Sequence, residues 1–404
     1  MLIEFKFKNF SSYKDETSIN LTKVKAFKEL ASTNTINTSK GFDLLKTTAI
    51  YGSNAGGKSN FIEAMLFMKS VIHNSFAESL KKDEDRGRKD FYFRLSTETE
   101  NKPTYFEVSF LQKDIIYRYG FEILGFDIVS EWLYKKNDVE TLLFDRKKQE
   151  FRINNKSFSE GNKFKNEVNA NVLFLSQLAQ NNGKEASIIF KWFLDVNVVS
   201  GLDDSYHEIA TKTLLKSSKK FKAWLNLAVK FLEISNIATS KNDELIAYHN
   251  KFDNNNLVVD SVSFDFELDE SAGTKKLIYL LGAIYDTLIN GKILFIDELD
   301  AKLHPNLSKK ILELFHKFNL FTSQFIFTAH DAILLDKKIF RRDQIWFVDR
   351  NKFGSSQLYP MSDFDSSVIR NTSDFRKKYL ESTFGAAETM NISNDLIELM
   401  YGKK

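Results

Sequence analysis

One short stretch constrains the fold and the chemistry of this chain more than any other. Residues 52–59 spell Gly-Ser-Asn-Ala-Gly-Gly-Lys-Ser, which matches the pattern G-x-x-x-x-G-K-S. An apolar run at 47–51 precedes it, and residues 60–72 carry apolar side chains at the spacing of a helix. In the order strand, glycine-rich loop, helix, backbone N–H groups surround a phosphate at the positive end of the helix. The sequence therefore predicts binding of a nucleoside triphosphate.

Each position of the loop has an expected role. The Lys58 amine would reach the β- and γ-phosphates, and the Ser59 hydroxyl would hold Mg²⁺. Glycines would let the backbone approach the ligand closely. The other residues expected to contact the nucleotide are Gly52, Asn54, Ala55, Gly56, Gly57 and Asn60. We therefore expect ATP and Mg²⁺ as cofactors.

The composition narrows the class of protein. The chain has no cysteine, which excludes disulfides, thiolate metal sites and cysteine nucleophiles. It has no apolar run of 18 residues, and residues 1–6 alternate as in a strand, so we expect no membrane span and a cytoplasmic location. A net charge of +3, from 57 basic and 54 acidic residues, predicts no strong bulk attraction to nucleic acid.

The region after the predicted P-loop helix changes character along its length. A charged run of mixed sign at 81–90 is expected to be a solvated loop. Short alternating segments between residues 104 and 153, separated by turn residues, predict an antiparallel meander. Apolar residues at helical spacing predict helices from about 186 to 237.

A second apolar strand carries the acidic part of the expected site. Residues 292–296 form a short apolar run that is followed by Asp297 and Glu298. Two carboxylates at the end of a buried strand, well downstream of a P-loop, are the Walker B pattern. Asp297 would bind Mg²⁺ through its water shell, and Glu298 would polarise the attacking water.

Two more features flank these carboxylates. Ser271, Gly273 and Thr274 stand at the predicted start of a helix, where a hydroxyl and free N–H groups form an anion site. Because one P-loop needs only one phosphate cradle, a second cradle suggests a site completed by another subunit. His330 follows the apolar strand 324–329 and is expected near the γ-phosphate.

These motifs, in this order and spacing, resemble the ABC-type ATPase heads of the SMC-like and OLD-like group. Within that group, the chain looks most like the stand-alone ATPases of bacterial abortive-infection modules, the RloA/AbiLi type. The segments that carry this closer resemblance are residues 9–16, 271–274, 303–305 and 376–386. The resemblance covers nearly the whole chain.

The resemblance implies a fold and a division of the chain. The fold would be α/β, an ABC-type P-loop ATPase head with a mixed core sheet, an antiparallel β subdomain and an inserted, mainly helical region. Residues 1–185 would form the N-terminal ATPase lobe with the meander. Residues 186–255 would form the helical insertion, and residues 256–404 the C-terminal lobe.

The resemblance also implies a composite site. Two heads would sandwich ATP, so that Ser271 and Gly273 of one chain reach the γ-phosphate bound at Lys58 of the other. Asp300 would lie near this seam and contact the nucleotide. His330 matches the switch histidine of the family.

Two further positions follow from the resemblance. Gln177 is our choice for the Q-loop residue that binds Mg²⁺, and Gln180 is the alternative. Many relatives carry Arg in the turn where this chain has Ser11, so the arginine on which an adenine or phosphate contact from that turn would rest is absent here.

The leading hypothesis is an ATPase switch in antiviral defence, in which ATP closes a homodimer or a higher homo-oligomer and hydrolysis opens it. OLD-type nucleases carry a C-terminal nuclease domain, and the stretch after His330 is too short for one. The expected effector is therefore a separate protein, a nuclease. One alternative is an SMC/RecF-like DNA-repair or chromosome-associated ATPase; DNA is a weak candidate partner because the net charge is near neutral. A transporter motor is disfavoured, since residues 271–274 and 303–305 depart from the transporter pattern.

Overall fold

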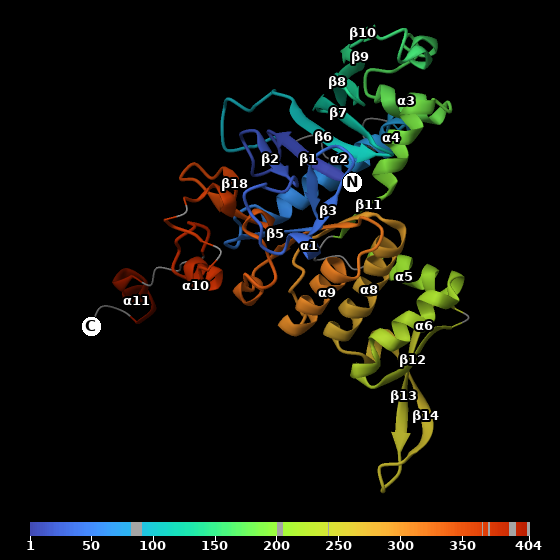
Figure 1. The fold of residues 1–404 in the computed structure, drawn as a ribbon, viewed down its shortest axis with the longest axis vertical. Helices are drawn as coiled ribbons and strands as arrows, with labels where there is room; N and C mark the ends of the chain where they lie inside the picture. The colour runs from blue at the N-terminus through green and yellow to red at the C-terminus, as the bar shows by residue number, and fades with distance from the viewer. Residues whose placement is uncertain are drawn as a thin grey trace.

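The structure, a computed structural model, describes residues 1–81, 91–199, 205–240, 242–365, 367–370, 372–387 and 393–401. Figure 1 shows an elongated arrangement, with an antiparallel sheet toward one end and a projecting hairpin at the other. Nearly all of the charged run predicted to be a loop at 81–90 lies outside the described residues. Among the residues that are described, no helix is both long and apolar enough to cross a membrane.

A mixed sheet forms the centre of the molecule. Its strand order is β11-β15-β16-β5-β17-β18, parallel throughout except for the antiparallel last pair. The strands are β11 (Val196–Val199), β15 (Ile293–Ile296), β16 (Gln324–Ala329), β5 (Thr47–Gly52), β17 (Ile345–Arg350) and β18 (Ser356–Pro360). Its inner strands are buried along their whole length, as expected for parallel strands covered on both faces. The predicted α/β class with a mixed core sheet is confirmed.

Alternate residues of the central strands face two different hydrophobic cores. Ile50 belongs to the core that contains helix α2 (Lys58–Ser79). Its neighbour Ala49 belongs to the core formed with α8 (Ala272–Asn290) and α9 (Pro305–Lys317). The helix after the P-loop and the helix before the Walker B strand therefore cover opposite faces of the sheet.

The predicted antiparallel meander is confirmed. It forms a second sheet with the order β10-β9-β8-β7-β6-β1-β2, antiparallel at every step. The strands are β1 (Leu2–Lys8), β2 (Thr17–Asn20), β6 (Thr104–Gln112), β7 (Ile115–Leu124), β8 (Asp127–Lys136), β9 (Glu140–Lys147) and β10 (Glu150–Ile153). This sheet shares its core with α2, so the chain's first strand is packed close to the P-loop helix.

Helices follow the meander, and a buried carboxylate of the sheet bonds the start of one of them, α3. The elements are the 3₁₀ turn η2 (Ser159–Lys163), α3 (Phe174–Gln180) and α4 (Lys184–Leu194). The Glu131 carboxylate of β8 accepts the N–H groups of Phe174 at 2.7 Å and Leu175 at 2.9 Å. Arg146 of β9 lies 3.5 Å from Glu131, and both side chains are fully buried. Losing one partner of such a pair leaves a buried charge, so the pair holds α3 against the sheet.

The segment between the two predicted lobes is less helical than expected. Helices α5 (Ser205–Ser217) and α6 (Lys219–Ala228) are present, but β11 joins the central sheet and residues 234–265 form a small antiparallel sheet. Its strands are β12 (Ile234–Thr239), β13 (Leu245–Phe252) and β14 (Val258–Asp265), followed by α7 (Phe266–Asp269). Strands β13 and β14 form the hairpin that projects from the body in Figure 1. Every residue of β14 is exposed, so no buried face imposes the alternating pattern by which a strand is found in sequence.

Short elements complete the fold. They are α1 (Ala31–Asn34), β3 (Thr35–Asn37), β4 (Asp43–Leu45), η3 (Lys230–Leu232), η4 (Ala332–Leu334), η5 (Arg342–Gln344), η6 (Met361–Asp363), α10 (Phe375–Leu380) and α11 (Asn394–Tyr401). Helix α10 contacts the central sheet through Tyr379, whose ring lies 5.8 Å from that of Tyr51. Helix α10 thus packs against the P-loop strand.

Candidate functional site

The P-loop lies at the carboxyl end of β5, against the neighbouring strand β17. Val348 of β17 stands opposite Gly52, and a Cβ added at Gly52 would lie 2.2 Å from the Val348 carbonyl oxygen. Gly57 has a φ of 120°, and a Cβ there would lie 2.3 Å from the Ser356 hydroxyl oxygen. Side chains are excluded from both positions, so the glycines of the motif let the loop fit between strand and helix.

Side chains that are distant in sequence fasten this loop. The Ser356 hydroxyl donates to the Gly56 carbonyl at 2.6 Å, and the Tyr13 hydroxyl donates to the Gly57 carbonyl at 3.0 Å. The Asn60 side-chain amide donates to the Ser12 hydroxyl at 2.8 Å. No spacing in the sequence connects Ser12 or Ser356 with the P-loop, so these contacts were missed. These residues reach the loop only once the chain has folded.

Lys58 lies inside the loop. Its residue is 4% exposed, and its ammonium donates to the carbonyls of Gly52 at 2.8 Å and Ser53 at 2.9 Å. Phosphate oxygens carry full negative charge and bind an ammonium more strongly than neutral carbonyls do. The lysine is therefore placed to exchange these carbonyls for a phosphate.

A pocket of about 150 Å³ opens in front of the loop. Its lining residues are Asn54, Ala55, Gly56, Gly57, Lys58, Ser59, Asn60, Glu298, His330 and Arg350. The folded chain thus brings the predicted phosphate loop together with the predicted Glu298 and His330, from three separate parts of the sequence. Arg350 also lines the pocket, although no motif pointed to it.

Glu298 and His330 stand next to each other in this pocket. His330 Nε2 lies 3.7 Å from Glu298 Oε1. Glu298 has a φ of 54°, a left-handed conformation that costs a non-glycine residue about 1–2 kcal/mol. Its N–H donates to the Thr328 hydroxyl at 2.7 Å, and its carbonyl accepts from the Lys276 ammonium at 2.9 Å. These backbone contacts hold the residue in the conformation that places its side chain in the pocket.

Asp297 lies behind Glu298, at the end of β15. It is 5% exposed, and its carboxylate accepts from the Thr328 hydroxyl at 2.6 Å. Burial and then the charge of Asp297 raise the pKa of Glu63 on α2. Mg²⁺ binds through oxygen atoms, commonly one or two carboxylates together with substrate phosphates. Ser59 lines the phosphate pocket and Asp297 precedes Glu298 of that pocket, so the two predicted ligands are oxygen donors of the kind that Mg²⁺ prefers.

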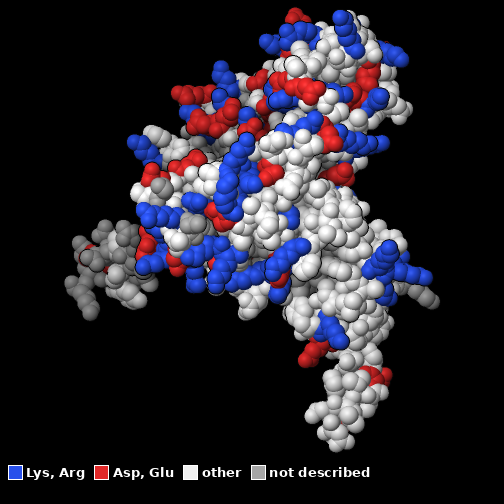
Figure 2. Space-filling view, in the orientation of Figure 1, with Lys and Arg blue, Asp and Glu red and all other residues white. Residues whose placement is uncertain are grey.

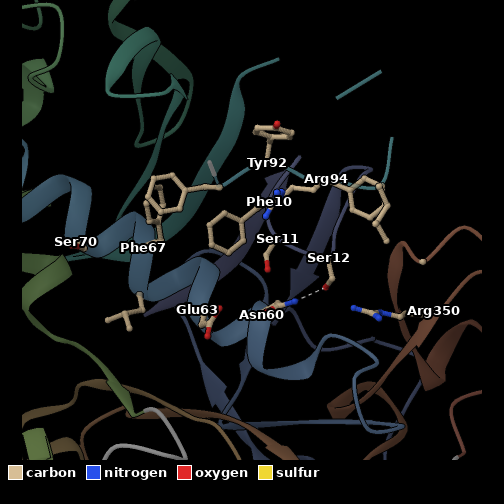
Figure 3. A pocket seen from close by; sticks show the side chains of 15 residues that line it. Phe10, Ser11, Ser12, Asn60, Glu63, Phe67, Ser70, Tyr92, Arg94 and Arg350 are labelled. Atoms are coloured by element: carbon tan, nitrogen blue, oxygen red, sulfur yellow. Dashed lines mark hydrogen bonds between the residues drawn. The ribbon is translucent and has the colours of Figure 1, made fainter. Parts of the chain in front are cut away.

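A larger cavity adjoins the phosphate pocket (Figure 3). It has a volume of about 620 Å³, and its walls include the rings of Phe10, Phe67 and Tyr92. Asn60 and Arg350 line both spaces, so the two spaces adjoin. Cavities of this size with aromatic walls and a few polar groups are typical of small-molecule sites.

Residues 47–336 match the family described as "AAA domain, putative AbiEii toxin, Type IV TA system". The chain belongs to this family. The match begins at β5 and extends beyond His330, so it includes every part of the phosphate pocket except Arg350. The protein is thus a P-loop ATPase of the AAA type. No curated protein matches the chain.

Solved structures similar to this AAA-family ATPase include heads of SMC proteins. The SMC head domain from Thermotoga maritima is 15% identical, with 89% of this chain and 98% of that chain covered and a TM-score of 0.44. The SmcHead bound to the C-winged helix domain of ScpA is 14% identical, with coverages of 91% and 99% and a TM-score of 0.48. An Smc head domain with an extended coiled coil, bound to the C-terminal domain of ScpA and derived from Pyrococcus furiosus, is 14% identical, with coverages of 89% and 96% and a TM-score of 0.46. These likenesses concern overall fold.

The predicted second phosphate cradle of this AAA-family ATPase lies outside the phosphate pocket. Ser271 caps helix α8, and its hydroxyl accepts the Thr274 N–H at 3.1 Å. A Cβ added at Gly273 would lie 2.9 Å from the Lys302 carbonyl oxygen. Ser271 is exposed to solvent. The helix start is therefore formed as predicted, but the fold does not join it to the P-loop of its own chain.

Asp300 makes its contacts within its own chain. Its Oδ2 accepts the N–H groups of His330 at 2.8 Å and Asp331 at 2.5 Å. Among the described residues its buried Oδ1 has no hydrogen-bond partner. Asp300 does not line the phosphate pocket of its own chain, and it shapes the turn that carries His330. Its place near a seam between two chains stays a prediction.

The predicted Q-loop residues lie away from the pocket. Gln177 and Gln180 are on α3, where the Ser176 hydroxyl donates to the Ile72 carbonyl of α2 at 2.6 Å. Ile72 is about 21 Å from Lys58 along the axis of α2, at a rise of roughly 1.5 Å per residue. The structure therefore does not bring Gln177 to the metal-binding residues. The local pattern around Gln177 carries no information on how far along α2 the helix α3 packs.

Proposed function

We propose that this protein is an ATP-binding and ATP-hydrolysing switch that acts as a head-to-head homodimer. The observation that supports the proposal is the separation of two phosphate-binding helix starts on one chain. The start of α2 opens into the phosphate pocket, whereas the start of α8 at Ser271 is exposed elsewhere. A second copy would bring its own α8 start to that pocket. Each site would then take Lys58 from one copy and Ser271 with Gly273 from the other.

ATP would span the two adjoining spaces. The triphosphate would lie in the pocket of about 150 Å³, where the loop N–H groups and Lys58 face it. The nucleoside would lie in the aromatic cavity of about 620 Å³, against Phe10 and Tyr92. Mg²⁺, when bound by Ser59 and Asp297, would neutralise charge on the β- and γ-phosphates. Lys58 would add a fixed positive charge on the same phosphates.

Hydrolysis would rest on Glu298 and His330. Glu298 would orient and polarise the attacking water with its carboxylate, and His330 would hydrogen-bond the γ-phosphate. The 3.7 Å between the two side chains keeps both on one side of the pocket. Catalysis would come from positioning and charge neutralisation, without a covalent intermediate.

The cellular role we propose is antiviral defence of the abortive-infection kind, as a member of the RloA/AbiLi type. The family description names an AbiEii toxin of a type IV TA system, and residues 9–16 and 376–386 resemble the RloA/AbiLi type. Closure of the dimer would control a separately encoded effector, a nuclease, in the cytoplasm. Residues 1–185 and 256–404 would form the head together with α4 and β11, and the rest of the segment 186–255 would be inserted between them.

The variant Glu298→Gln tests the switch. It removes the negative charge that polarises water and keeps the size of the side chain. We expect ATP to remain bound, the dimer to persist, and the rate of hydrolysis to fall by about 10²- to 10⁴-fold. Phosphate release measures the rate, and light scattering coupled to size exclusion measures the dimer. Both are read with ATP and Mg²⁺ present.

Glu313→Gln is the matched control. Glu313 lies on α9, where it pairs with Lys310 and Lys317 and lies outside the phosphate pocket. This variant should hydrolyse ATP at the wild-type rate. A monomeric Glu298→Gln protein at saturating ATP, or unchanged turnover, would refute the proposal. Hydrolysis that depends on added DNA would instead favour a DNA-associated ATPase.

A further inference from the structure

We propose that Arg350 is a nucleotide-binding residue whose guanidinium contacts the phosphates nearest the nucleoside, the α- and β-phosphates. The inference rests on the proposed function, since it assumes that ATP occupies the two adjoining spaces. It assigns a role to a residue that no sequence motif singles out. It also predicts which nucleotides depend on that residue.

The register of the central sheet places Arg350 beside the P-loop. Strand β17 runs parallel to β5, with Val348 opposite Gly52, and Arg350 follows two residues later. Side chains two apart on a strand point to the same face. Val348 faces the core that contains α2, so Arg350 projects on the side where the P-loop helix begins.

Arg350 lies at the junction of the phosphate pocket and the aromatic cavity. It lines both, as does Asn60. The Asn60 amide is engaged by the Ser12 hydroxyl, whereas Figure 3 shows the Arg350 guanidinium directed toward the space beside Ser12. Within the described part of the chain, no carboxylate forms an ion pair with this guanidinium, and its donors make no hydrogen bond. An arginine so placed has its full donor capacity available to a ligand.

Two other residues of the phosphate pocket already have a proposed role. Glu298 and His330 lie 3.7 Å apart, line this pocket but not the aromatic cavity, and are the residues assigned to the γ-phosphate. Arg350 instead adjoins the aromatic cavity, which would take the nucleoside. A guanidinium presents several N–H donors in a plane and binds phosphate oxygens in pairs. Its place at the junction therefore matches the α- and β-phosphates, which ATP and ADP share.

The test compares ATP and ADP binding in Arg350→Ala and Arg350→Lys, by calorimetry. ATP is measured on the Glu298→Gln background, where hydrolysis is slow. We expect Arg350→Ala to weaken both nucleotides by a similar factor, about 10- to 100-fold, because one charged contact is lost from each. Arg350→Lys should recover part of the affinity, since it keeps the charge without the paired donors. Without nucleotide, the melting temperature of Arg350→Ala should equal that of the wild type, because the side chain makes no polar contact to lose.

Lys352→Ala is the matched control. Lys352 lies two residues beyond Arg350, its ammonium sits over the Phe353 ring, and it lies outside both spaces. It should bind both nucleotides as the wild type does. Wild-type affinity in Arg350→Ala would overturn the inference, and so would a loss confined to ATP, which would place the contact at the γ-phosphate. If the wild-type protein itself binds neither nucleotide, the proposed function fails together with the inference, and the two failures are thereby distinguished.

Discussion

The starts of helices α2 and α8 differ in how much of their own chain surrounds them. At the start of α2, Ser356 and Tyr13 hold the loop carbonyls and Lys58 is 4% exposed. At the start of α8, Ser271 is exposed and its hydroxyl bonds one turn ahead to Thr274. One phosphate site is therefore built by the folded chain, while the other helix start is left open. Two helix starts that both carry glycine and a hydroxyl side chain thus form different surfaces, because different parts of the chain pack against them.

The surfaces beside the two helix starts differ in the same sense. Near α2, the buried rings of Phe7 and Tyr13 lie 4.9 Å apart, and those of Phe7 and Phe61 lie 5.8 Å apart. Before α8, the β13–β14 hairpin leaves Val259 59% exposed, and Leu268 of α7 is 83% exposed. Figure 2 shows that this hairpin carries few charged side chains on the face in view. Exposed apolar surface of this kind is typical of contacts between proteins, which agrees with a second copy docking on the α8 side.

The largest effect is expected when the P-loop and the start of α8 are each inactivated in a separate variant and the two variants are then mixed. Lys58→Ala removes the ammonium of the enclosed side and should lower ATP affinity at least about 100-fold. Ser271→Arg blocks the open side with a bulky side chain. Each variant alone should be inactive, whereas an equal mixture should recover roughly a quarter of the wild-type rate. This follows because half of the dimers are mixed, and each mixed dimer keeps one intact site of two. Phosphate release measures the rate.

A second mixture controls for nonspecific recovery. Here a Lys58→Ala chain is mixed with a Glu298→Gln chain. Both residues belong to the phosphate pocket of their own chain, so each of the two ATP sites in a mixed dimer carries one defect. This mixture should stay inactive. Equal recovery in both mixtures, or none in the first, would contradict a site shared between two copies.

A smaller effect, on the free energy of unfolding, is expected when glycines with a positive φ are replaced by alanine. Gly57 is closely surrounded and Gly41 is not. Gly57→Ala places a methyl group 2.3 Å from the Ser356 hydroxyl oxygen, whereas Gly41, with a φ of 79°, has no atom within 4 Å of its added Cβ. We expect Gly57→Ala to lower the free energy of unfolding by roughly 2–4 kcal/mol, from backbone strain and overpacking together. Gly41→Ala carries the backbone strain alone, about 1 kcal/mol. Urea unfolding measures both, and equal losses would show that the P-loop is not tightly enclosed.

The smallest effect is the pH dependence of stability that arises from His316, which is buried against the P-loop strand β5. His316 Nε2 lies 2.7 Å from the Thr47 hydroxyl of β5, and burial, followed by the charge of Lys46, lowers the pKa of His316 to about 3. The unfolded chain takes up this proton near pH 6.5, while the folded chain stays neutral until about pH 3. The stabilisation is therefore complete above pH 6.5 and is lost as the pH falls toward 3.

Acidification from pH 7.5 to 5.5 should thus lower the free energy of unfolding of the wild type by about 1.4 kcal/mol more than that of His316→Asn. Urea unfolding at the two pH values measures the difference. The exposed His304, where Asn can also cap α9, gives the control variant His304→Asn, which should behave as the wild type. An equal loss in the wild type and His316→Asn would show that His316 is not held neutral beneath the P-loop strand.

Residues that directly follow a recognisable strand could be placed in the site from the sequence. Glu298 and His330 each follow an apolar strand, and the carboxyl ends of parallel strands meet at one edge of a sheet. That rule brings them to the P-loop without any knowledge of side-chain packing. It does not extend to Gln177, whose distance from Lys58 depends on where α3 packs along α2.

The sequence by itself determined the P-loop, the strands that carry Asp297 and His330, the meander and the helix start at Ser271. Each of these features depends on a pattern of residues that are close together in the sequence. Only the tertiary structure decided that Ser12 and Ser356 clasp the loop, that Arg350 joins two cavities, and that Asp300 serves its own chain. The physical reason is that these contacts join residues of separate elements, 30 to 344 positions apart, and their distances are set by the packing of whole sheets and helices.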